Sequence, residues 1–337
     1  YVLKHNKDAL KIFSIILLGV YLIELIHGYY QFFLDREYYY GKRLSILFGD
    51  ELILGSFLSR LLPLMFVLSL LVFKKNKIFL IFLSIVIILT DTLVYISGER
   101  TAFFYLLIGV TLLILMSKEY KLLRLGTFFI SIIIIAYISL IDEYVKDRMI
   151  KQTINDIFNV DQTTSSNLNL NESIVENSNK AIQNENKNLL FNKFHFFSPA
   201  HTELYSSSMH ILSDNNYFYG VGPKLFRFHC KNKKYLDFNG PNSCSTHPHN
   251  SYVQLITEVG LIGLTPVILL FFYISFIIIK HIINILFKNN EILNNIEVGA
   301  YICIFITLWP IAPTGSFFNN WLNIIYYLPL IFLLYEK

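Results

Sequence analysis

The stretch LIGLTPVILLFFYISFIIIKHIINILF, residues 261–287, decides the fold class. It carries one charged residue, Lys280, and is long enough to cross a bilayer, whose hydrocarbon core is about 30 Å thick. With 54% hydrophobic residues and a mean hydropathy of +0.49, the chain is too apolar for an ordinary soluble domain. Further apolar runs lie at 11–28, 57–73, 78–96, 102–117, 124–141, 297–311 and 321–335. We therefore expect an all-α polytopic membrane protein with about eight transmembrane helices.

Basic residues near the ends of these runs give the orientation, because positive residues in short loops stay on the cytoplasmic side. They are Lys4, Lys7, Lys11, Lys74, Lys75, Lys77, Lys118, Lys121, Arg124, Lys280, Lys288 and Lys337. Both ends are then cytoplasmic, and segments 29–56, 97–101, 142–260 and 312–320 face outward. The net charge of +4 needs no nucleic-acid partner to explain it. The chain starts at Tyr1 and shows no signal peptide. A further expectation is that additional helices precede this segment.

The chain divides into five helices in 1–141, one large outward loop in 142–260, and three helices in 261–337. Within the loop, 153–188 is rich in Asn, Ser, Gln and Glu and has no sustained apolar face. Such a composition cannot bury a core, so we expect a mobile insertion there. Ser198-Pro199 then predicts the start of a helix.

That helix is expected over 199–212, and the next feature is the turn Gly220-Val221-Gly222-Pro223. Glycines allow a tight turn, and such a turn can present backbone N–H groups to an anion. Most turns of this composition are simply turns, so the two readings stay open.

Two histidines precede the long apolar run, in STHPHNSY, residues 245–252. His249 is the strongest catalytic candidate, because a neutral imidazole can accept a proton near neutral pH. Pro248 restricts the backbone of His247, and Asn250 can cap the helix that follows. The alternative is that both histidines are interfacial polar residues that mark a helix entrance.

The spacing downstream favours the catalytic reading. From His249-Asn250, nine residues lead to Gly260, and two more lead to Gly263. This resembles the histidine motif of the O-antigen ligase family: His, then Asn, Ser or Arg, nine of any residue, Gly, two of any, and a small residue or Tyr. The resemblance extends to Ser97-Gly98-Glu99-Arg100-Thr101-Ala102, the Gly220 turn, Trp309-Pro310 and Asn319-Asn320-Trp321.

The resemblance implies a GT-C-like architecture and an inverting glycosyltransferase that needs no metal or other cofactor. The implied donor is an undecaprenyl-diphosphate-linked glycan, and the implied acceptor is lipid A-core or another glycan. It implies a multi-pass protein of the bacterial inner membrane, embedded in membrane lipids, with its active site facing the periplasm. O-antigen polymerases and protein O-oligosaccharyltransferases share the superfamily. A transporter or channel with an outward vestibule, or a structural scaffold, remains an alternative from a different class.

The resemblance also implies roles for individual residues, with His249 as the base. A guanidinium at Arg100 could bind a diphosphate in bidentate fashion, or could cap its helix or pair with Glu99. The family usually has a second arginine at the start of the loop helix, where this chain has His201. The missing cation could come from Arg227, Arg148 or Arg43, while His247 and Asn250 are further candidates for substrate binding.

Cysteines and one acidic residue complete the set. In an oxidising compartment, Cys230 and Cys244 of the outward loop could form a disulfide, whereas Cys303 lies in a predicted span. The alternative is a metal site that also uses His229 and His247, although this spacing matches no zinc pattern. Asp91 is costly inside a span unless it faces the bundle interior, where it either joins helices or lines the site. The resemblance gives Gly220, Gly222, Gly260 and Gly263 structural roles.

Overall fold

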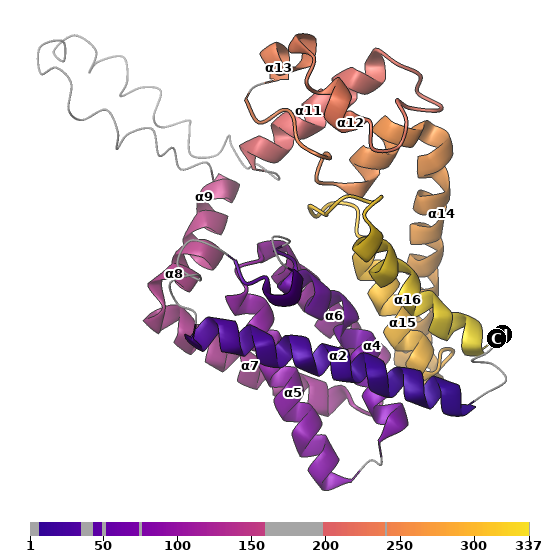
Figure 1. Cartoon of the computed structure of the whole chain (residues 1–337). Coiled ribbons are helices and arrows are strands. Elements are labelled where there is room, and N and C mark those ends of the chain that lie inside the picture. The colour runs from indigo at the N-terminus through magenta and orange to yellow at the C-terminus, as the bar shows by residue number, and fades with distance from the viewer. Residues whose placement is uncertain are drawn as a thin grey trace, which may run out of the picture.

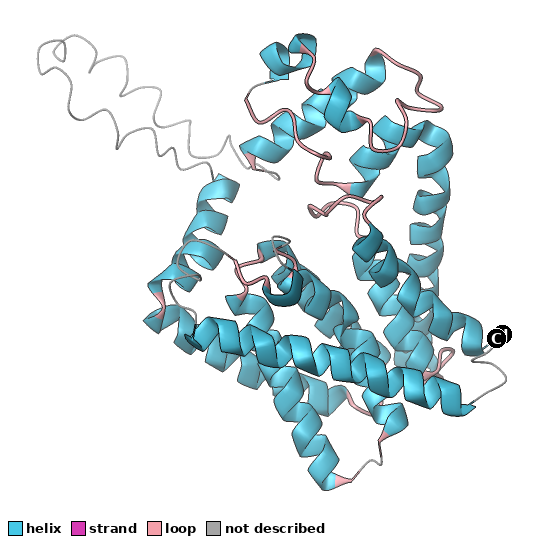
Figure 2. Ribbon diagram, in the orientation of Figure 1, coloured by secondary structure: helices cyan, strands magenta, loops and turns pink. Residues whose placement is uncertain are grey.

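The structure is a computed structural model, and it describes residues 7–34, 43–48, 52–73, 76–158, 198–239 and 241–336. Every regular element in these ranges is a helix (Figures 1 and 2). All eight predicted apolar runs are helical: α2 (Lys7–Leu34), α4 (Leu54–Val72), α5 (Lys77–Ile96), α6 (Arg100–Met116), α7 (Lys121–Ile141), α14 (Ser251–Lys288), α15 (Asn295–Thr307) and α16 (Asn320–Glu336). In the described part of the chain, five of them, α2, α4, α5, α7 and α14, are long and apolar enough to cross a membrane.

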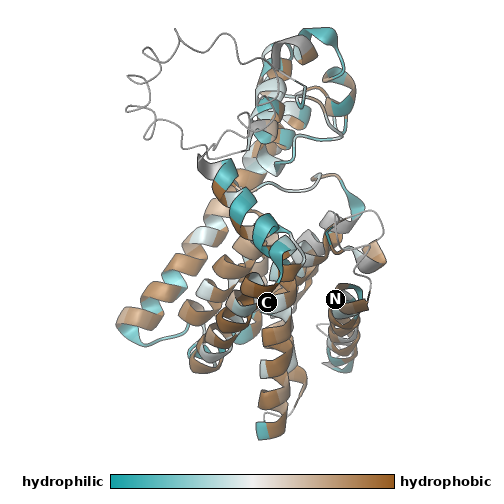
Figure 3. Ribbon diagram, turned by 90° about the vertical axis from the view of Figure 1, so that its left-hand side faces the viewer, coloured by the Kyte–Doolittle hydropathy of each residue, from teal (hydrophilic) through white to brown (hydrophobic). Residues whose placement is uncertain are grey.

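Helix α4 is the centre of the bundle, packed against α2, α5, α6 and α15. It is buried on nearly all sides, which explains why its sequence is apolar without a polar stripe. Gly299 of α15 allows close packing, because a side chain there would meet Val67 and the backbone of Pro63. The outer faces of the surrounding helices are also apolar, as Figure 3 shows, and include the exposed side chains of Ile78 and Leu122. A bundle that is apolar both inside and outside suits a lipid environment.

The loop between α7 and α14 begins with the short helical elements α8 (Glu143–Lys146), η2 (Asp147–Lys151) and α9 (Gln152–Phe158). The predicted insertion at 153–188 therefore starts as helix, and its residues from 159 onward lie outside the described ranges.

Helices α11 (Pro199–Ser213), α12 (Phe226–His229) and α13 (Lys233–Asn239) gather at the end of the molecule where α14 begins (Figure 1). The predicted helix start is confirmed, since Ser198 is the N-cap of α11 and Pro199 its first residue. A small apolar core that includes Leu204, Ile211 and Phe226 holds these helices together. A disulfide between Cys230 and Cys244 ties α12 to the segment that leads into α14.

Helix α14 begins at Ser251, ten residues before the apolar run at 261–287, and the prediction that Asn250 caps the helix that follows it is confirmed. Asn250 caps it by accepting hydrogen bonds from the backbone N–H groups of Tyr252 and Val253. Gly260 then interrupts the helix with φ 65° and ψ −166°. The N–H groups freed by this kink are satisfied by the loop, since Leu261 donates to the carbonyl of Tyr217 and Ile262 to that of Phe218.

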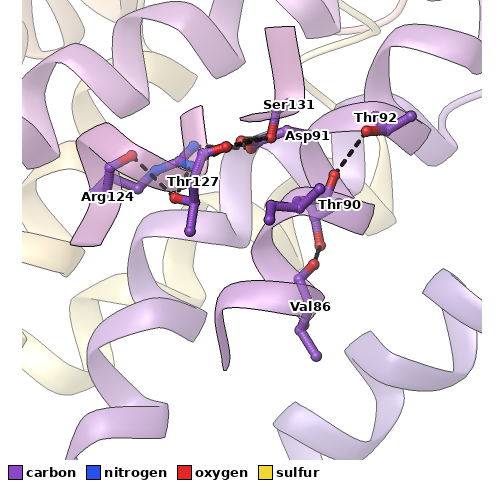
Figure 4. A network of polar contacts seen from close by, with 8 residues as sticks. Val86, Thr90, Asp91, Thr92, Arg124, Thr127 and Ser131 are labelled. Carbon is purple, nitrogen blue, oxygen red and sulfur yellow. Dashed lines mark hydrogen bonds and ion pairs between the residues drawn. The ribbon is translucent and has the colours of Figure 1, made fainter. Parts of the chain in front are cut away.

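Arg124, which the basic pattern assigned to a cytoplasmic turn, lies in the first turn of α7 and is buried. Its two terminal nitrogens donate to the two carboxylate oxygens of Asp91 on α5, each at 2.8 Å (Figure 4). Ser131 donates a further hydrogen bond to Asp91 at 3.0 Å. Asp91 therefore joins α5 to α7 and is not among the residues that line the cavity described below.

Candidate active site

A cavity of about 1390 Å³ lies between the helical bundle and the α11–α13 layer. Its wall is formed by the first turns of α4 and α6, the start of α11, the segment before α14 and the segment between α15 and α16. Six basic residues line it against two acidic ones: Arg43, Arg60, Arg100, Arg148, Lys224 and Arg227, with Glu99 and Asp156. This excess of positive charge suits an anionic ligand.

Three histidines meet in this cavity, although they come from α11 and from the segment before α14. The ring centroids of His247 and His249 are 4.2 Å apart, and those of His201 and His249 are 6.0 Å apart. Ser245 Oγ lies 3.3 Å from Nε2 of His249. The Ser198 hydroxyl, at the N-cap of α11, lies 2.6 Å from Nδ1 of His201. The structure thus brings all three sequence-predicted histidines to one wall.

The backbone of His249 is held in an unusual conformation, with φ 59°. Thr314 donates its backbone N–H to the His249 carbonyl at 2.8 Å. The side chain of Asn250 donates to the carbonyl of Pro310 at 2.8 Å. Asn250 therefore caps α14 and fastens the segment after α15 beside His249, so its contacts are structural ones.

Burial keeps these imidazoles uncharged. It lowers the pKa of His249 below the ordinary 6.5, with smaller contributions from His201 and the positive charge of Arg43. It lowers the pKa of His247 to about 4, with His249 as the next cause. The pKa of His201 is lowered by burial and then by Arg100. At neutral pH the three rings can accept protons, and His201 cannot replace an arginine's charge.

Arg100 is the first residue of α6, and its Nη1 donates to Asp156 of α9 at 2.7 Å. Both side chains remain about one third exposed, so the guanidinium keeps access to the cavity. The predicted alternative partner, Glu99, is engaged elsewhere: it accepts hydrogen bonds from the backbone of Gly55 and from the backbone and hydroxyl of Ser56. Burial raises the pKa of Glu99.

The other candidate cations also reach the cavity. Arg148 donates to the carbonyl of Gly98 at 3.3 Å and to Gln152 at 2.8 Å. Burial and then the charges of Arg100 and Arg43 lower the pKa of Arg148. Arg227 lies near His247, and the positive charge of Arg227 helps to lower the pKa of His247. The cations therefore flank the histidines from two sides.

The Gly220 turn packs on α14 rather than opening toward a ligand. Val221 and Gly222 donate their N–H groups to the carbonyls of Thr257 and Glu258, at 3.0 and 2.7 Å. Glycine is required at Gly220, where φ is 64° and a side chain would collide with the carbonyl of Thr257. The N–H groups of Val221 and Gly222 therefore bind carbonyl groups of α14 and not an anion.

Sequence reasoning missed the role of Glu258, a fully buried residue of α14. Its carboxylate accepts hydrogen bonds from the backbone N–H groups of Lys224 and Phe226. Gln254, one turn earlier, donates to Glu258 and to Ser316, and accepts from the N–H of Phe317. Two polar residues four apart in an otherwise apolar helix were the available signal. They join both cavity walls to α14, the helix that follows His249.

Gly260 gives a stability prediction. Gly260→Ala should lower the melting temperature clearly, because φ is 65° and the added methyl would meet the backbone of Phe218. With ψ −166° as well, this is a backbone conformation found almost only in glycine, and it costs about 1–3 kcal/mol for a residue with a side chain. Thermal unfolding in detergent measures the effect, with Gly126→Ala as the control, since nothing lies within 4 Å of a methyl there. Equal melting temperatures for the two variants would contradict the packing described.

Gly263, the last glycine of the motif, lies in α14 after the kink, where an added side chain would meet Val259. Gly220 and Gly260 therefore make close backbone contacts that leave no room for a side chain. Gly222 has φ 108°, a conformation that favours glycine in the turn. In the described part of the chain, no group of three or more His, Cys, Asp and Glu residues is arranged to hold a metal ion.

Comparison with known proteins gives one match. The O-antigen ligase family model matches residues 83–268, which is more than half of the chain. No curated protein and no solved structure matches. The matched region runs from α5 to the kinked part of α14 and includes Arg100, His201 and His249. The chain therefore belongs to the O-antigen ligase family.

Proposed function

We propose that this protein is an inverting, metal-independent glycosyltransferase that moves a glycan from undecaprenyl diphosphate to lipid A-core. The reaction takes place at the periplasmic face of the bacterial inner membrane. The observation that carries the proposal is the position of His249, held neutral by burial in a cavity that arginines line. A base beside a concentration of positive charge is what the displacement of a diphosphate by a hydroxyl group needs.

In this mechanism the acceptor hydroxyl gives its proton to the His249 imidazole while its oxygen attacks the anomeric carbon of the donor. The bond between that carbon and the diphosphate oxygen breaks, and the electron pair leaves with the diphosphate. Arg100, at the N-terminal end of α6, stabilises the negative charge that develops on the leaving diphosphate. Because attack and departure occur on opposite faces of the sugar, the anomeric configuration inverts.

The aromatic residues around Trp309 suit the lipid part of such a donor. Phe104 and Trp309 both line the cavity, with ring centroids 6.0 Å apart, and the Phe104 side chain is 40% exposed. Phe271 of α14 and Phe305 of α15 pack against Trp309 from the other side. An apolar chain could pass here from the bilayer while its charged group stays in the cavity.

A reconstituted transfer assay tests the proposal. Purified protein in vesicles is given undecaprenyl-diphosphate-linked glycan and lipid A-core, with a metal chelator throughout. Transfer to lipid A-core that persists with chelator and falls strongly in Arg100→Gln is the expected result. Lengthening of the donor glycan without transfer to lipid A-core would identify a polymerase instead. Loss of transfer with chelator would contradict metal independence.

The pH dependence follows from the lowered pKa of His249. A base acts in its neutral form, and here the pKa lies below the ordinary value of 6.5. Activity should therefore be level through the neutral range, and should fall as the pH drops through the folded-state pKa below 6.5. Initial rates of transfer across the acid range, at donor concentrations well below KM, measure the profile of kcat/KM, which reports the pKa of the free protein. An inflection above 6.5 would contradict the assignment of His249 as a buried neutral base.

A further inference from the structure

The strongest unexplained feature of the cavity is Arg60, in the second turn of α4. It is only 2% exposed, yet it lines the cavity. Its Nε is buried without a hydrogen-bond partner, and among the described residues no carboxylate pairs with its guanidinium. One face of the guanidinium is covered by the Tyr105 ring of α6, at 4.6 Å.

Arg124 shows what a buried arginine of this bundle has when its role is to join helices. The Nε of Arg124 is also without a hydrogen-bond partner, but its terminal nitrogens donate two hydrogen bonds to Asp91 and a third to Thr127. A buried arginine without such partners is costly to a membrane protein, and by default marks a place where a ligand supplies the counter-charge. Arg60 is therefore placed for an anion that enters the cavity.

The position of Arg60 relative to Arg100 defines the shape of that anion. Arg60 stacks on Tyr105, which lies five residues further along α6 than Arg100. Five residues of α-helix rise by about 7.5 Å, so the backbone of Tyr105 lies about that much further along α6 than the backbone of Arg100, and Arg60 lies beside the Tyr105 ring. Two guanidinium groups at different depths match an anion with two linked charged groups in line with the helix axes.

From this geometry we infer that Arg60 and Arg100 bind the two phosphates of a lipid diphosphate, with Arg60 on the phosphate that carries the lipid. Arg60 thereby supplies the second fixed charge that the neutral His201 cannot provide. This inference rests on the proposed function, and deepens it by giving the chain a means to select diphosphate over monophosphate lipids. Arg60 is a binding residue for the phosphate that both lipids carry, while Arg100 faces the second phosphate, which leaves the sugar and is present only in the diphosphate lipid.

The test is direct binding of undecaprenyl diphosphate and undecaprenyl monophosphate to the purified full chain in detergent, measured by quenching of tryptophan fluorescence. The parent is compared with Arg60→Gln and Arg60→Lys. We expect Arg60→Gln to bind the diphosphate lipid about 10- to 100-fold more weakly, which is the usual effect of losing a charge-assisted contact. The single phosphate of the monophosphate lipid is the one that Arg60 binds, so Arg60→Gln should weaken binding of that lipid by a similar factor, whereas Arg100→Gln should weaken the diphosphate lipid alone. Arg60→Lys should recover part of the loss.

Folding is checked by melting temperature, with Arg124→Gln as the matched variant of a buried but paired arginine. Arg60→Gln should melt no lower than the parent, because an unpaired buried charge does not stabilise the empty protein. A lower melting temperature with unchanged affinity for both lipids would mean that Arg60 is structural, and would overturn the inference.

Two further outcomes separate the possibilities. If inorganic pyrophosphate binds the parent as tightly as the lipid does, the site takes free diphosphate and the lipid assignment is overturned. If the parent binds undecaprenyl diphosphate but Arg60→Gln binds it equally well, only the assignment of Arg60 fails. No binding of the lipid by the parent would overturn the proposed donor, and with it this inference.

Discussion

Replacing His249 by Asn should lower the rate of glycan transfer by about 10²- to 10⁴-fold, the usual contribution of a general base. Asn is the appropriate substitution because His249 has φ 59°, a conformation that Asn tolerates better than Ala. The hydrogen bond from Thr314 uses the backbone carbonyl at this position, so it survives the change. Turnover of an undecaprenyl-diphosphate-linked donor in vesicles gives the measurement.

The matched control for this experiment is His229→Asn. His229 lies in α12 and is not among the residues lining the cavity. Its substitution should leave the rate within about twofold of the parent if only the base matters. A His249→Asn protein that melts like the parent and still transfers glycan at the parent's rate would remove His249 from the mechanism.

Asp91→Ala should lower the free energy of unfolding by about 3–5 kcal/mol, because it leaves Arg124 charged and buried without a partner. Both side chains are almost completely inaccessible, at 0% and 1% exposed. The double variant Asp91→Leu/Arg124→Leu should recover most of this loss, since an apolar pair removes the uncompensated charge. Unfolding followed by circular dichroism in detergent compares the single and double variants.

The same variants separate stability from catalysis. Because neither residue lines the cavity, the transfer rate per folded molecule should stay near that of the parent in the double variant. If the double variant is no more stable than Asp91→Ala, the loss does not come from the unpaired charge of Arg124. Loss of transfer in a well-folded double variant would give the pair a functional role that its position does not suggest.

The apolar periodicity of the chain was sufficient to predict the helices, because burial and lipid exposure both demand apolar residues in long runs. Helix boundaries were less accessible. The apolar run at 261–287 marks only the later part of α14, whose first ten residues, before and at the Gly260 kink, are more polar and are indicated by the Asn250 cap instead. Arg124 was assigned to a turn because charge patterns count basic residues without showing that a distant Asp91 neutralises one of them.

The site was predictable where chemistry and spacing coincide. His249 and Arg100 stand in recognisable motifs, and the structure brings both to one cavity. Arg60 and Glu258 were not found as site residues, since their significance comes from what surrounds them. Arg60 is notable because it lacks a partner, and Glu258 because it accepts backbone hydrogen bonds from residues more than thirty positions away. Neither property can be read from a single sequence.

The anomeric configuration of the transferred glycan tests the central claim most directly. The product formed by the purified protein from a donor of known configuration is isolated, and its new linkage is assigned by nuclear magnetic resonance. Direct displacement assisted by His249 predicts a linkage inverted relative to the bond with the diphosphate. A product with retained configuration, or the absence of any transferred glycan, would contradict the account.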